Sequence, residues 1–415
     1  MLEIVRFDPT RCGYPKPRIP VLPKRVQLKL LGYSSSRRTP GSSSFVFLDS
    51  GLRRNDDHRS SNFRSFARGR YALHAAYELA GVTSGTTLLA PSYHCLTMLD
   101  PAIHLGADVR LYPLNPDLSP DLDRLDALIG QCTSPVKALV ATHFFGIRQD
   151  FTRLQQWCQQ RDIALIEDCS HTLFTEDYQA PGIGRFGTFV AASPYKFFPC
   201  EDGGLLHARD ESSLQDIHTV APSLMEELSA AKHTLEHHAA AHRETPHDPD
   251  RKLSTLLHSP RTPATTVRYG YTTPSSAFAQ NLLNRSASRL SRWLVRRTSP
   301  ESAAEKRREN FSRWLNTTRD IPNCRPLYSH LPDDCVPYMF PLYIDHPEPH
   351  FDLLKRLGFP VWRWDEMAIS DCSVATDYRL HLLHLPCHQS LGEAQMDWLV
   401  AVIQKVMQTP AAGDH

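Results

Sequence analysis

The sequence predicts an α/β fold, with a large domain built on a mostly parallel sheet flanked by helices and a smaller α+β domain towards the C-terminus. Three observations lead to this prediction. The chain has 415 residues, enough for two or three packed units. Hydrophobic residues make up 41% and charged residues 22%, as in soluble globular proteins. Apolar runs without alternation are separated by helical stretches, which is typical of parallel strands covered on both faces.

Six apolar runs are the predicted strands of the large domain. They are TTLLA (86–90), DVRLYPL (108–114), VKALVATHFF (136–145), IALIEDC (163–169), TFVAAS (188–193) and GGLLHA (203–208). Between the third and fourth runs, Phe151, Leu154, Trp157 and Cys158 fall on one helical face, which predicts a strand–helix–strand unit. An earlier helix is predicted in ARGRYALHAAYELAG, with Gly81 at its C-terminal end.

The composition divides the chain into three parts. Residues 1–62 are expected to be a basic, Ser-rich, partly disordered extension, residues 63–300 the large domain, and residues 301–415 the small domain. Up to Arg70 there are 15 Lys and Arg against 5 Asp and Glu, whereas the remainder has 31 against 40. A basic arm can bind nucleic acid, but no binding motif accompanies it, so no nucleic-acid partner is expected.

The sequence also bears on location and metal binding. No run approaches the roughly 18 apolar residues of a membrane span, so none is expected. The first 30 residues mix Pro, Lys and Arg without an apolar block, which argues against a secretory signal and favours a cytoplasmic location. Ten cysteines include no CxxC pair, and the pairs of His at helical spacing around His233 lack a supporting ligand framework. No metal site is therefore expected.

One cluster of polar residues is embedded in the apolar runs. Asp168 and His171 lie in IEDCSH, and Lys196 lies in SPYK after the next run. Ligands of parallel sheets bind at the C-terminal ends of strands, where Asp168 and Lys196 should emerge. A Lys can form an imine with an aldehyde cofactor, and an acid can keep a pyridine nitrogen protonated. The combination indicates pyridoxal 5'-phosphate, with Lys196 as the imine-forming residue and Asp168 as the acid.

A phosphate group on that cofactor needs its own donors. Backbone N–H groups at the start of a helix bind phosphate, and hydroxyl or cationic side chains add to them. Gly69, Arg70 and Tyr71 open the predicted helix of GRYALHAA, so they are candidates for this contact. Ser193, three residues before Lys196, is the candidate hydroxyl.

The order of the motifs carries a family resemblance. GRYAL, APSYHC followed by LGA, HFFGIRQD, IEDCSH, GRFGTF, SPYK and DGGLL occur in this order. In this the chain resembles the DegT/StrS family of pyridoxal-phosphate-dependent aminotransferases of fold type I. The resemblance runs from about Phe66 to Arg209 and resumes more weakly from Arg307 to about Val406. It implies that Lys196 binds the cofactor and carries the proton.

The same resemblance implies further roles and an activity. Asp168 would pair with the pyridinium, and His171 would lie beside the ring near its hydroxyl. The implied reaction moves an amino group from an amino acid donor to a keto acceptor, by family analogy a nucleotide-linked keto sugar for polysaccharide or secondary-metabolite biosynthesis. Family members that dehydrate sugars use His in place of the lysine, so Lys196 favours transamination. The family's sites commonly lie at a dimer interface, which implies a homodimer.

The chain also departs from the family pattern. The family places an aromatic residue, which stacks on the cofactor, where this chain has Cys95, and His94 or Tyr93 is the candidate replacement. A Ser usually found five residues before the lysine is absent, which is why Ser193 is assigned the phosphate contact. The segment that corresponds to the family's YNYR motif, residues 269–272, lacks both the amide and the guanidinium.

These departures leave other functions open. One alternative is a cofactor-binding regulatory or scaffold protein without turnover, and another is a different pyridoxal phosphate reaction such as decarboxylation or elimination. Gly182, Gly184 and Gly187 spell GxGxxG, but they precede a predicted strand instead of opening a helix, which argues against a dinucleotide site. Trp362 and Arg363 could reach a substrate from the small domain.

Overall fold

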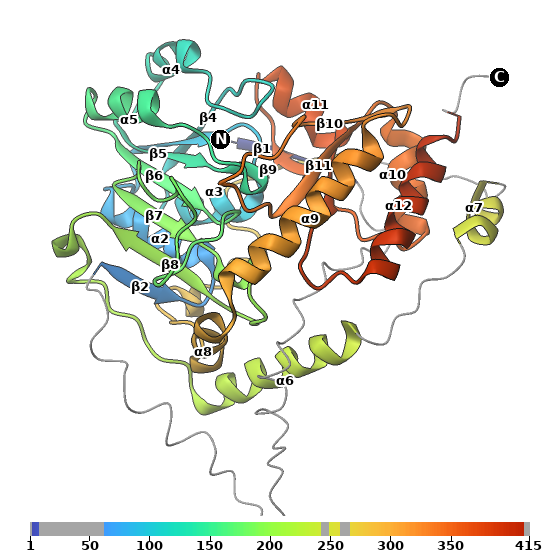
Figure 1. Cartoon of the computed structure of the whole chain (residues 1–415). Helices are drawn as coiled ribbons and strands as arrows, with labels where there is room; N and C mark the ends of the chain where they lie inside the picture. The colour runs from blue at the N-terminus through green and yellow to red at the C-terminus, as the bar shows by residue number, and fades with distance from the viewer. Residues whose placement is uncertain (1, 8–61, 242–248, 258–265, 411–415) are drawn as a thin grey trace, which may run out of the picture.

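A seven-stranded sheet forms the centre of the large domain in the computed structural model, which describes residues 2–7, 62–241, 249–257 and 266–410 (Figure 1). Its order is β2-β8-β7-β6-β5-β3-β4. The strands are β2 (Phe63–Phe66), β3 (Thr87–Pro91), β4 (Asp108–Tyr112), β5 (Val136–Thr142), β6 (Ala164–Cys169), β7 (Phe189–Ala192) and β8 (Gly204–Ala208). β3 to β7 run parallel, and only β8 and β2 are antiparallel to their neighbours. The predicted α/β class with a mostly parallel sheet is confirmed.

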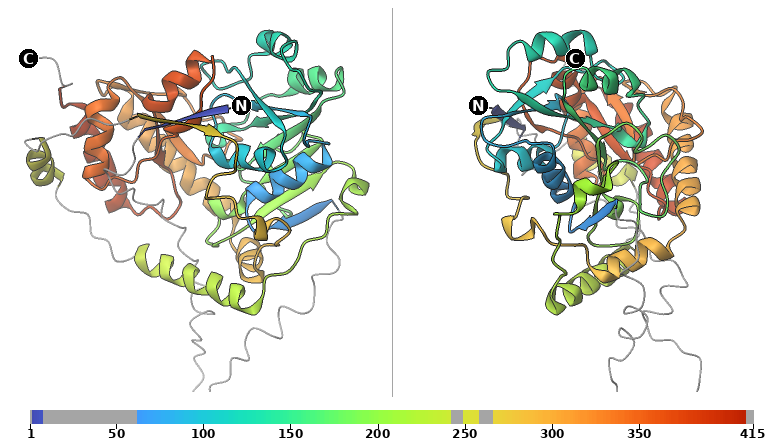
Figure 2. Two further views of the ribbon diagram at one scale, coloured as in Figure 1. Left: turned by 180° about the vertical axis from the view of Figure 1, so that it is seen from behind. Right: turned by 90° about the vertical axis from the view of Figure 1, so that its left-hand side faces the viewer.

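Helices cover both faces of this sheet (Figure 2). They are α2 (Gly69–Leu79), α3 (Leu96–His104), α4 (Leu122–Ile129) and α5 (Thr152–Gln159). Leu88 and Ala90 of β3 pack in one core cluster with α2 and α3, whereas Leu89 packs in another with α4 and α5. Successive side chains of a strand point to opposite faces, so a strand covered on both sides is apolar throughout. This explains the unbroken apolar runs of the sequence.

A second, smaller sheet joins segments that are far apart in the chain. Its central strand β1 (Leu2–Phe7) pairs antiparallel with β9 (Thr266–Tyr271) on one side and β12 (Glu366–Ala368) on the other. The sequence analysis assigned no strand to residues 2–7. β9 contains the segment compared with YNYR, and its Tyr271 hydroxyl donates to buried Asp100 of α3 at 2.5 Å. The small sheet therefore links the N-terminal strand to both domains.

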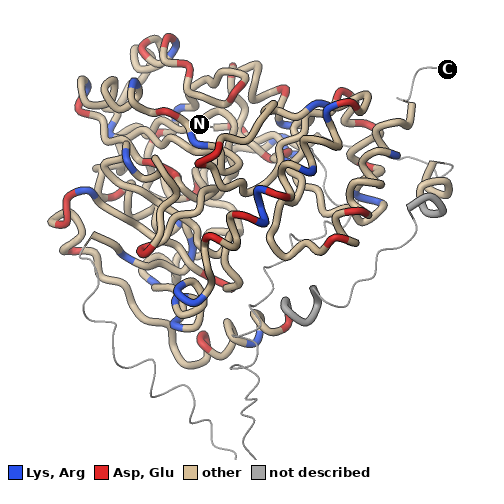
Figure 3. Tube along the Cα trace, in the orientation of Figure 1, with Lys and Arg blue, Asp and Glu red and all other residues tan. Residues whose placement is uncertain are grey.

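The C-terminal part has its own sheet and core. Strands β10 (Cys324–Pro326), β11 (Met339–Ile344) and β13 (Leu382–Pro386) are antiparallel, and Phe340, Leu342, Leu383 and Leu385 are fully buried. The helices of this part are α9 (Pro300–Thr318), α10 (Pro347–Arg356), α11 (Ser373–His381) and α12 (Glu393–Met407). A ridge of charged residues of both signs follows α9 across the front of the molecule (Figure 3).

The connection between the two parts is largely helical. It contains α6 (Leu224–Ala241), α7 (Pro249–Leu257) and α8 (Arg289–Arg297), with short 3₁₀ turns η4 (Glu211–Leu214) and η5 (Gln280–Leu282). Within the described ranges, none of the helices combines the length and the apolar character that crossing a bilayer requires. Most of the basic N-terminal extension, residues 8–61, lies outside the described residues.

Candidate functional site

The predicted site residues meet at the C-terminal edge of the large sheet. Thr142 ends β5, Asp168 lies near the end of β6, and Lys196 ends the 3₁₀ turn η3 (Pro194–Lys196) that follows β7. Because β5, β6 and β7 are parallel neighbours, these ends lie side by side. They line an open pocket of about 440 Å³, a volume that includes space open to solvent. The lining residues are Arg68, Gly69, Arg70, Leu73, Cys95, Thr97, Met98, Thr142, Asp168, Ser170, His171, Ser193, Tyr195, Lys196 and Trp364.

Most of the predicted residues line this pocket, but Tyr71, Tyr93 and His94 do not. The Tyr71 ring is buried in the core between the sheet and α2, and its hydroxyl accepts a hydrogen bond from Ala279 N at 3.1 Å. A residue at the first turn of a helix can point its side chain inwards while its backbone still belongs to the helix start. Tyr71 therefore contributes packing to the base of α2.

Tyr93 and His94 lie behind the pocket wall, so the structure does not bring either ring into the pocket. Tyr93 is fully buried, and its hydroxyl lies 2.8 Å from His384 Nε2. His94 Nε2 accepts from Ala368 N at 3.2 Å, while Nδ1 faces two backbone carbonyls. Burial lowers the pKa of His94 to about 4, so its ring is neutral. These contacts tie the loop after β3 to the C-terminal part.

Asp168 offers a buried acceptor to the pocket. Only 4% of its surface is exposed, and Ser170 N donates to Oδ1 at 2.9 Å. Among the described residues, nothing donates a hydrogen bond to its Oδ2. Thr142 Oγ1, next to Asp168 in the β5–β6 register, is also buried without a hydrogen-bond partner in the described chain. Buried polar atoms normally have partners, so these two fit a ligand that brings a protonated ring nitrogen.

Lys196 lines the same pocket, and its amine lies beside an aromatic ring. Its Nζ is 5.3 Å from the centre of the Tyr338 ring. Burial by itself would lower the pKa of Lys196, but the acidic groups around it, Tyr195 and Tyr338 first, raise the pKa above its usual value. The free amine is therefore protonated at neutral pH, and it becomes a nucleophile only after losing that proton.

The backbone of Lys196 is held from the C-terminal part by a buried arginine. Arg307 of α9 donates to Lys196 O at 2.9 Å and to the carbonyls of Pro337 and Tyr338 at 3.1 Å each. Its Nε donates to Gln389 Oε1 at 2.6 Å. One guanidinium thus joins the lysine turn to the loop that carries Tyr338. Helix α9 reaches from the C-terminal part to the large domain in this region (Figure 1).

His171 completes the group around the pocket as a neutral ring. Burial, followed by the charge of Lys196, holds the pKa of His171 well below its usual value. Phe145 N donates to its Nδ1 at 3.4 Å, which places the hydrogen on Nε2. Tyr338 stacks on the imidazole with ring centres 4.7 Å apart. The ring is fixed and can donate from Nε2 to a ligand oxygen.

The opposite end of the pocket can take an anion. Gly69 opens α2, and Ser193 Oγ lies 3.1 Å from Ser170 Oγ beside it. A Cβ on Gly69 would come within 2.0 Å of Ser193 Oγ, so only glycine permits this approach. The N-terminus of a helix carries partial positive charge, and two hydroxyls add donors. Arg70 also lines the pocket, although its guanidinium bonds Ala277 O.

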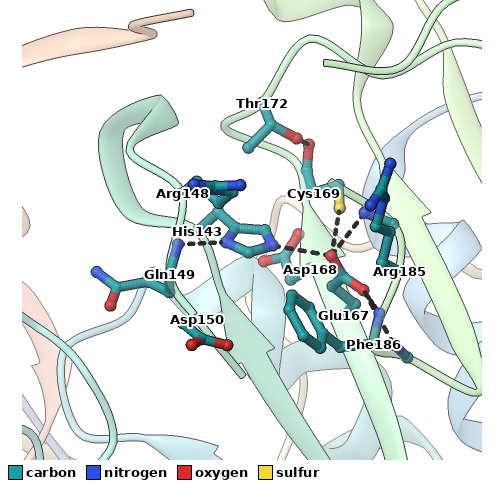
Figure 4. Close-up of polar contacts among 12 residues, drawn as sticks. His143, Arg148, Gln149, Asp150, Glu167, Asp168, Cys169, Thr172, Arg185 and Phe186 are labelled. Atoms are coloured by element: carbon teal, nitrogen blue, oxygen red, sulfur yellow. Dashed lines mark hydrogen bonds and ion pairs between the residues drawn. The ribbon is translucent and has the colours of Figure 1, made fainter. Parts of the chain in front are cut away.

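Beneath Asp168, the neighbouring Glu167 is bound by a separate network (Figure 4). It is fully buried and accepts from His143 Nε2 at 2.8 Å and from the backbone N–H groups of Gly184, Phe186 and Gly187 at 2.6–2.9 Å. Burial would raise the pKa of Glu167, but these hydrogen bonds outweigh it and the pKa lies below its usual value. The GxGxxG glycines thus belong to a loop that binds a carboxylate of the protein itself.

The Glu167 network includes three residues with side chains that can ligate metals. His143, Glu167 and Cys169 lie close enough to share an ion. However, His143 Nδ1 accepts from Gln149 N at 3.0 Å, and both Glu167 oxygens already accept hydrogen bonds. The ligand atoms are occupied by protein donors. The expectation of no metal site stays a prediction.

Several pocket residues were missed by the sequence analysis. Thr142 and Ser170 are small polar residues at strand ends, and their position next to Asp168 was a usable signal. Trp364 comes from the segment after Val361, in which the sequence analysis selected Trp362 and Arg363. Trp362 is 38% exposed, whereas Arg363 is buried against the Phe351 ring. Sequence alone could not tell which of the two tryptophans faces the pocket.

Comparison with known proteins confirms the first part of the resemblance, from about Phe66 to Arg209. Residues 58–242 match the model of the DegT/DnrJ/EryC1/StrS aminotransferase family. The chain is 29% identical over 137 residues to the L-glutamine:2-deoxy-scyllo-inosose aminotransferase of Streptomyces kanamyceticus, which covers 32% of this chain and 31% of that protein. It is 26% identical over 133 residues to the GDP-perosamine synthase of Vibrio cholerae, with 32% and 34% covered. The chain thus matches about a third of the length of these relatives.

The fold extends further than the sequence match. The structure of NtdA from Bacillus subtilis with bound cofactor PMP covers 84% of this chain and 73% of that one, with a TM-score of 0.57 and 13% identity. At this identity the likeness concerns the fold, and the predicted fold type I architecture is confirmed. The weaker resemblance from Arg307 to Val406 lies outside the matched family range and stays a prediction.

Proposed function

We propose that this chain, whose residues 58–242 belong to the DegT/DnrJ/EryC1/StrS aminotransferase family, is a pyridoxal-phosphate-dependent aminotransferase. The observation that carries the proposal is the meeting of Lys196, Asp168 and His171 around one pocket. Asp168 and His171 come from the end of β6 and the turn after it, and Lys196 comes from the turn after β7. The match to the curated relatives covers about a third of their length, so the activity of the whole protein is inferred from the site.

The pocket has a place for each part of the cofactor. Asp168 would hold the pyridine nitrogen protonated, His171 Nε2 would donate to the ring oxygen, and Lys196 would bind the aldehyde carbon. The phosphate would lie at Gly69 and the hydroxyls of Ser193 and Ser170. When bound, the cofactor supplies an electron sink for the carbon that loses or gains the amino group.

The side chains of the protein then handle protons. Lys196 Nζ, in its neutral form, takes the proton from the carbon that bears the donor's amino group. Asp168 offers a carboxylate to the ring nitrogen, and the hydrogen bond from Ser170 N fixes its orientation. The Tyr338 ring, which stacks on His171, lies beside the amine and limits the access of water.

The proposed substrates follow from the relatives. The donor is an amino acid, and the acceptor is a keto group on a sugar or cyclitol ring, with a nucleotide-linked keto sugar of polysaccharide or secondary-metabolite biosynthesis as the first candidate. The names of the two curated relatives, one acting with L-glutamine and one forming GDP-perosamine, support this class. A homodimer in the cytoplasm and a division into domains at residues 62 and 300 belong to the same proposal.

A spectral titration tests the activity. Purified protein loaded with pyridoxal phosphate should show an absorbance band that disappears when L-glutamine or L-glutamate is added, and the keto acid should appear in equal amount. Borohydride treatment before the donor should add the cofactor mass to Lys196. The matched control is Lys196→Arg, which keeps the positive charge but should lose both the adduct and the reaction.

The alternatives predict other outcomes. A bound cofactor that no amino donor converts would support the non-catalytic protein. Release of carbon dioxide or of an eliminated group would indicate decarboxylation or elimination. A protein that binds no pyridoxal phosphate at all would overturn the proposal. Light scattering that gives a monomer at full cofactor loading would overturn the homodimer.

A further inference from the structure

The wall of the pocket contains one aromatic residue from the C-terminal part of the chain. Trp364 lines the pocket together with Cys95, Thr97 and Met98. Of the lining residues, it alone lies beyond position 300 in the sequence. Cys95 is small and half-buried, so the loop after β3 presents no ring at this point. A planar ligand that enters here therefore meets an aromatic surface that a distant segment supplies.

Other rings hold Trp364 in place. Its ring centre lies 4.8 Å from that of Tyr93 and 5.3 Å from that of His384, and Phe144 packs edge-on at 6.2 Å. Tyr93 and Phe144 are almost fully buried, and the Tyr93 hydroxyl is fixed by His384. The indole thus has a rigid support behind it, whereas part of it stays accessible at the pocket. A supported ring of this kind loses little conformational freedom on binding a ligand.

The other aromatic residues of the wall also pack against neighbouring groups. His171 lies against Tyr338, with ring centres 4.7 Å apart and planes at 27°. Tyr195 packs under the guanidinium of Arg68, whose central carbon lies 4.7 Å from the ring centre. The ring of Trp364 is 5.6 Å from that of His171 at an angle of 37°, so it stands next to the residue assigned to the ring oxygen. Part of the indole stays accessible, so Trp364 offers a planar surface beside the position of a pyridine ring.

We propose that Trp364 supplies the aromatic face of the cofactor site and stacks against the pyridine ring in place of a residue at position 95. The inference rests on the proposed function, because it concerns the same pocket. Offset or tilted aromatic pairs are stabilising beyond the area that they bury. The segment that carries Trp364 would therefore make cofactor retention depend on the packing of the C-terminal part against the large domain.

Cofactor affinity tests this role apart from turnover. Trp364→Ala should raise the dissociation constant of pyridoxal phosphate by about tenfold or more, whereas Trp364→Phe should change it by less than about threefold. Trp398 on α12, which stacks on Phe359, provides the matched control. Trp398→Ala removes the same side chain elsewhere in the C-terminal part and should leave the dissociation constant unchanged.

Fluorescence gives a readout that does not depend on stability. Cofactor binding should reduce the tryptophan emission of the unmodified chain, and Trp364→Phe should remove a larger part of that reduction than Trp398→Phe does. As a single substitution, Cys95→Tyr should weaken the binding of pyridoxal phosphate, because the new ring crowds Trp364. The same change should restore binding in Trp364→Ala, because the new ring replaces the lost one.

The outcomes separate this inference from the proposed function. If the unmodified chain binds pyridoxal phosphate at Lys196 but Trp364→Ala binds it equally well, the role of Trp364 is overturned and the function stands. An equal reduction of emission in Trp364→Phe and in Trp398→Phe has the same meaning. If the unmodified chain binds no cofactor, both proposals are overturned. Should Trp364→Ala fail to fold, the Trp364→Phe fluorescence comparison still decides.

Discussion

Gly69 shows how a single missing side chain shapes the site. Its Cα lies so close to Ser193 Oγ that a methyl group would reach it at 2.0 Å. The residue also begins α2, where glycine is less favourable than alanine for helix formation. The close contact therefore outweighs the local helix preference, and it keeps two hydroxyls at the start of a helix.

Gly69→Ala should weaken the binding of pyridoxal phosphate by about tenfold or more, because the methyl group displaces Ser193 and separates the hydroxyls from the helix start. The dissociation constant can be measured by absorbance titration. Pyridoxal, which lacks the phosphate, is the control ligand, and its affinity should change little. An equal loss for both ligands would place the phosphate elsewhere.

Asp168 and Glu167 illustrate how neighbouring carboxylates acquire different roles. Side chains of adjacent strand residues point to opposite faces, so Asp168 lines the pocket and Glu167 lies beneath it. Both Glu167 oxygens accept hydrogen bonds from protein donors, whereas within the described residues Asp168 accepts one only at Oδ1. Two adjacent residues of one strand thus have different roles. Asp168 faces the proposed ligand, and Glu167 stabilises the protein structure.

At the scale of elements, Glu167 of β6 holds the loop before β7 in place by hydrogen bonds. Gly184, at φ 76°, and Gly187 permit the loop to turn so that three backbone N–H groups point at one carboxylate. β7 leads directly into the turn of Lys196. The loop therefore helps to fix the position of Lys196 relative to Asp168.

Glu167→Gln should destabilise the protein by about 3 kcal/mol, because a buried amide cannot accept as many hydrogen bonds from His143 and the loop. Urea denaturation measures the change in unfolding free energy. Glu176→Gln, a substitution of a half-buried residue beside Arg296, is the comparison and should cost about 1 kcal/mol or less. A similar small loss for both variants would show that the network contributes little.

Helix α9 connects the two parts through Arg307. Its guanidinium spans from the carbonyl of Lys196 to those of Pro337 and Tyr338, so the loop of Tyr338 and the lysine turn share one donor. Burial lowers the pKa of Arg307 to about 10, which still leaves it charged at neutral pH. The position of the amine is thereby linked to the packing of the C-terminal part.

At the scale of the whole molecule, several histidines are buried in their neutral form. Burial lowers the pKa of His94 to about 4 and that of His384 to about 3, and it holds those of His171 and His388 well below the usual value. In the unfolded chain these residues titrate near pH 6.5. Between these values the unfolded state binds more protons than the folded state, so unfolding becomes easier as the pH falls.

The free energy of unfolding should therefore decrease between about pH 7 and about pH 5, by up to about 2 kcal/mol for each such histidine. Urea denaturation at the two pH values measures the slope. His384→Gln removes one titrating group, which contacts Tyr93. The decrease in unfolding free energy between the two pH values should therefore be smaller by the contribution of one histidine. The lowered pKa of Glu167 acts mainly below this range. A slope that is unchanged in His384→Gln would contradict the assignment.

Much of the fold could be read from the chain because its causes are local. Unbroken apolar runs predicted β3 to β8, and the strand ends placed Asp168 and Lys196 at one edge, since parallel strands share the direction of their ends. The helix starting at Gly69 was predicted by its spacing. β1 could not be predicted in the same way, because its partners, β9 and β12, lie hundreds of residues away.

The sequence by itself determined which residue types meet at the sheet edge, because strand direction and motif order depend on neighbours along the chain. Only the tertiary structure decided which rings face the pocket. Tyr93 and His94 turn away from it because His384 and the backbone of Ala368 provide their partners, and Trp364 enters it from the C-terminal part. Such choices depend on contacts between distant segments, where packing and hydrogen bonding outweigh any local preference.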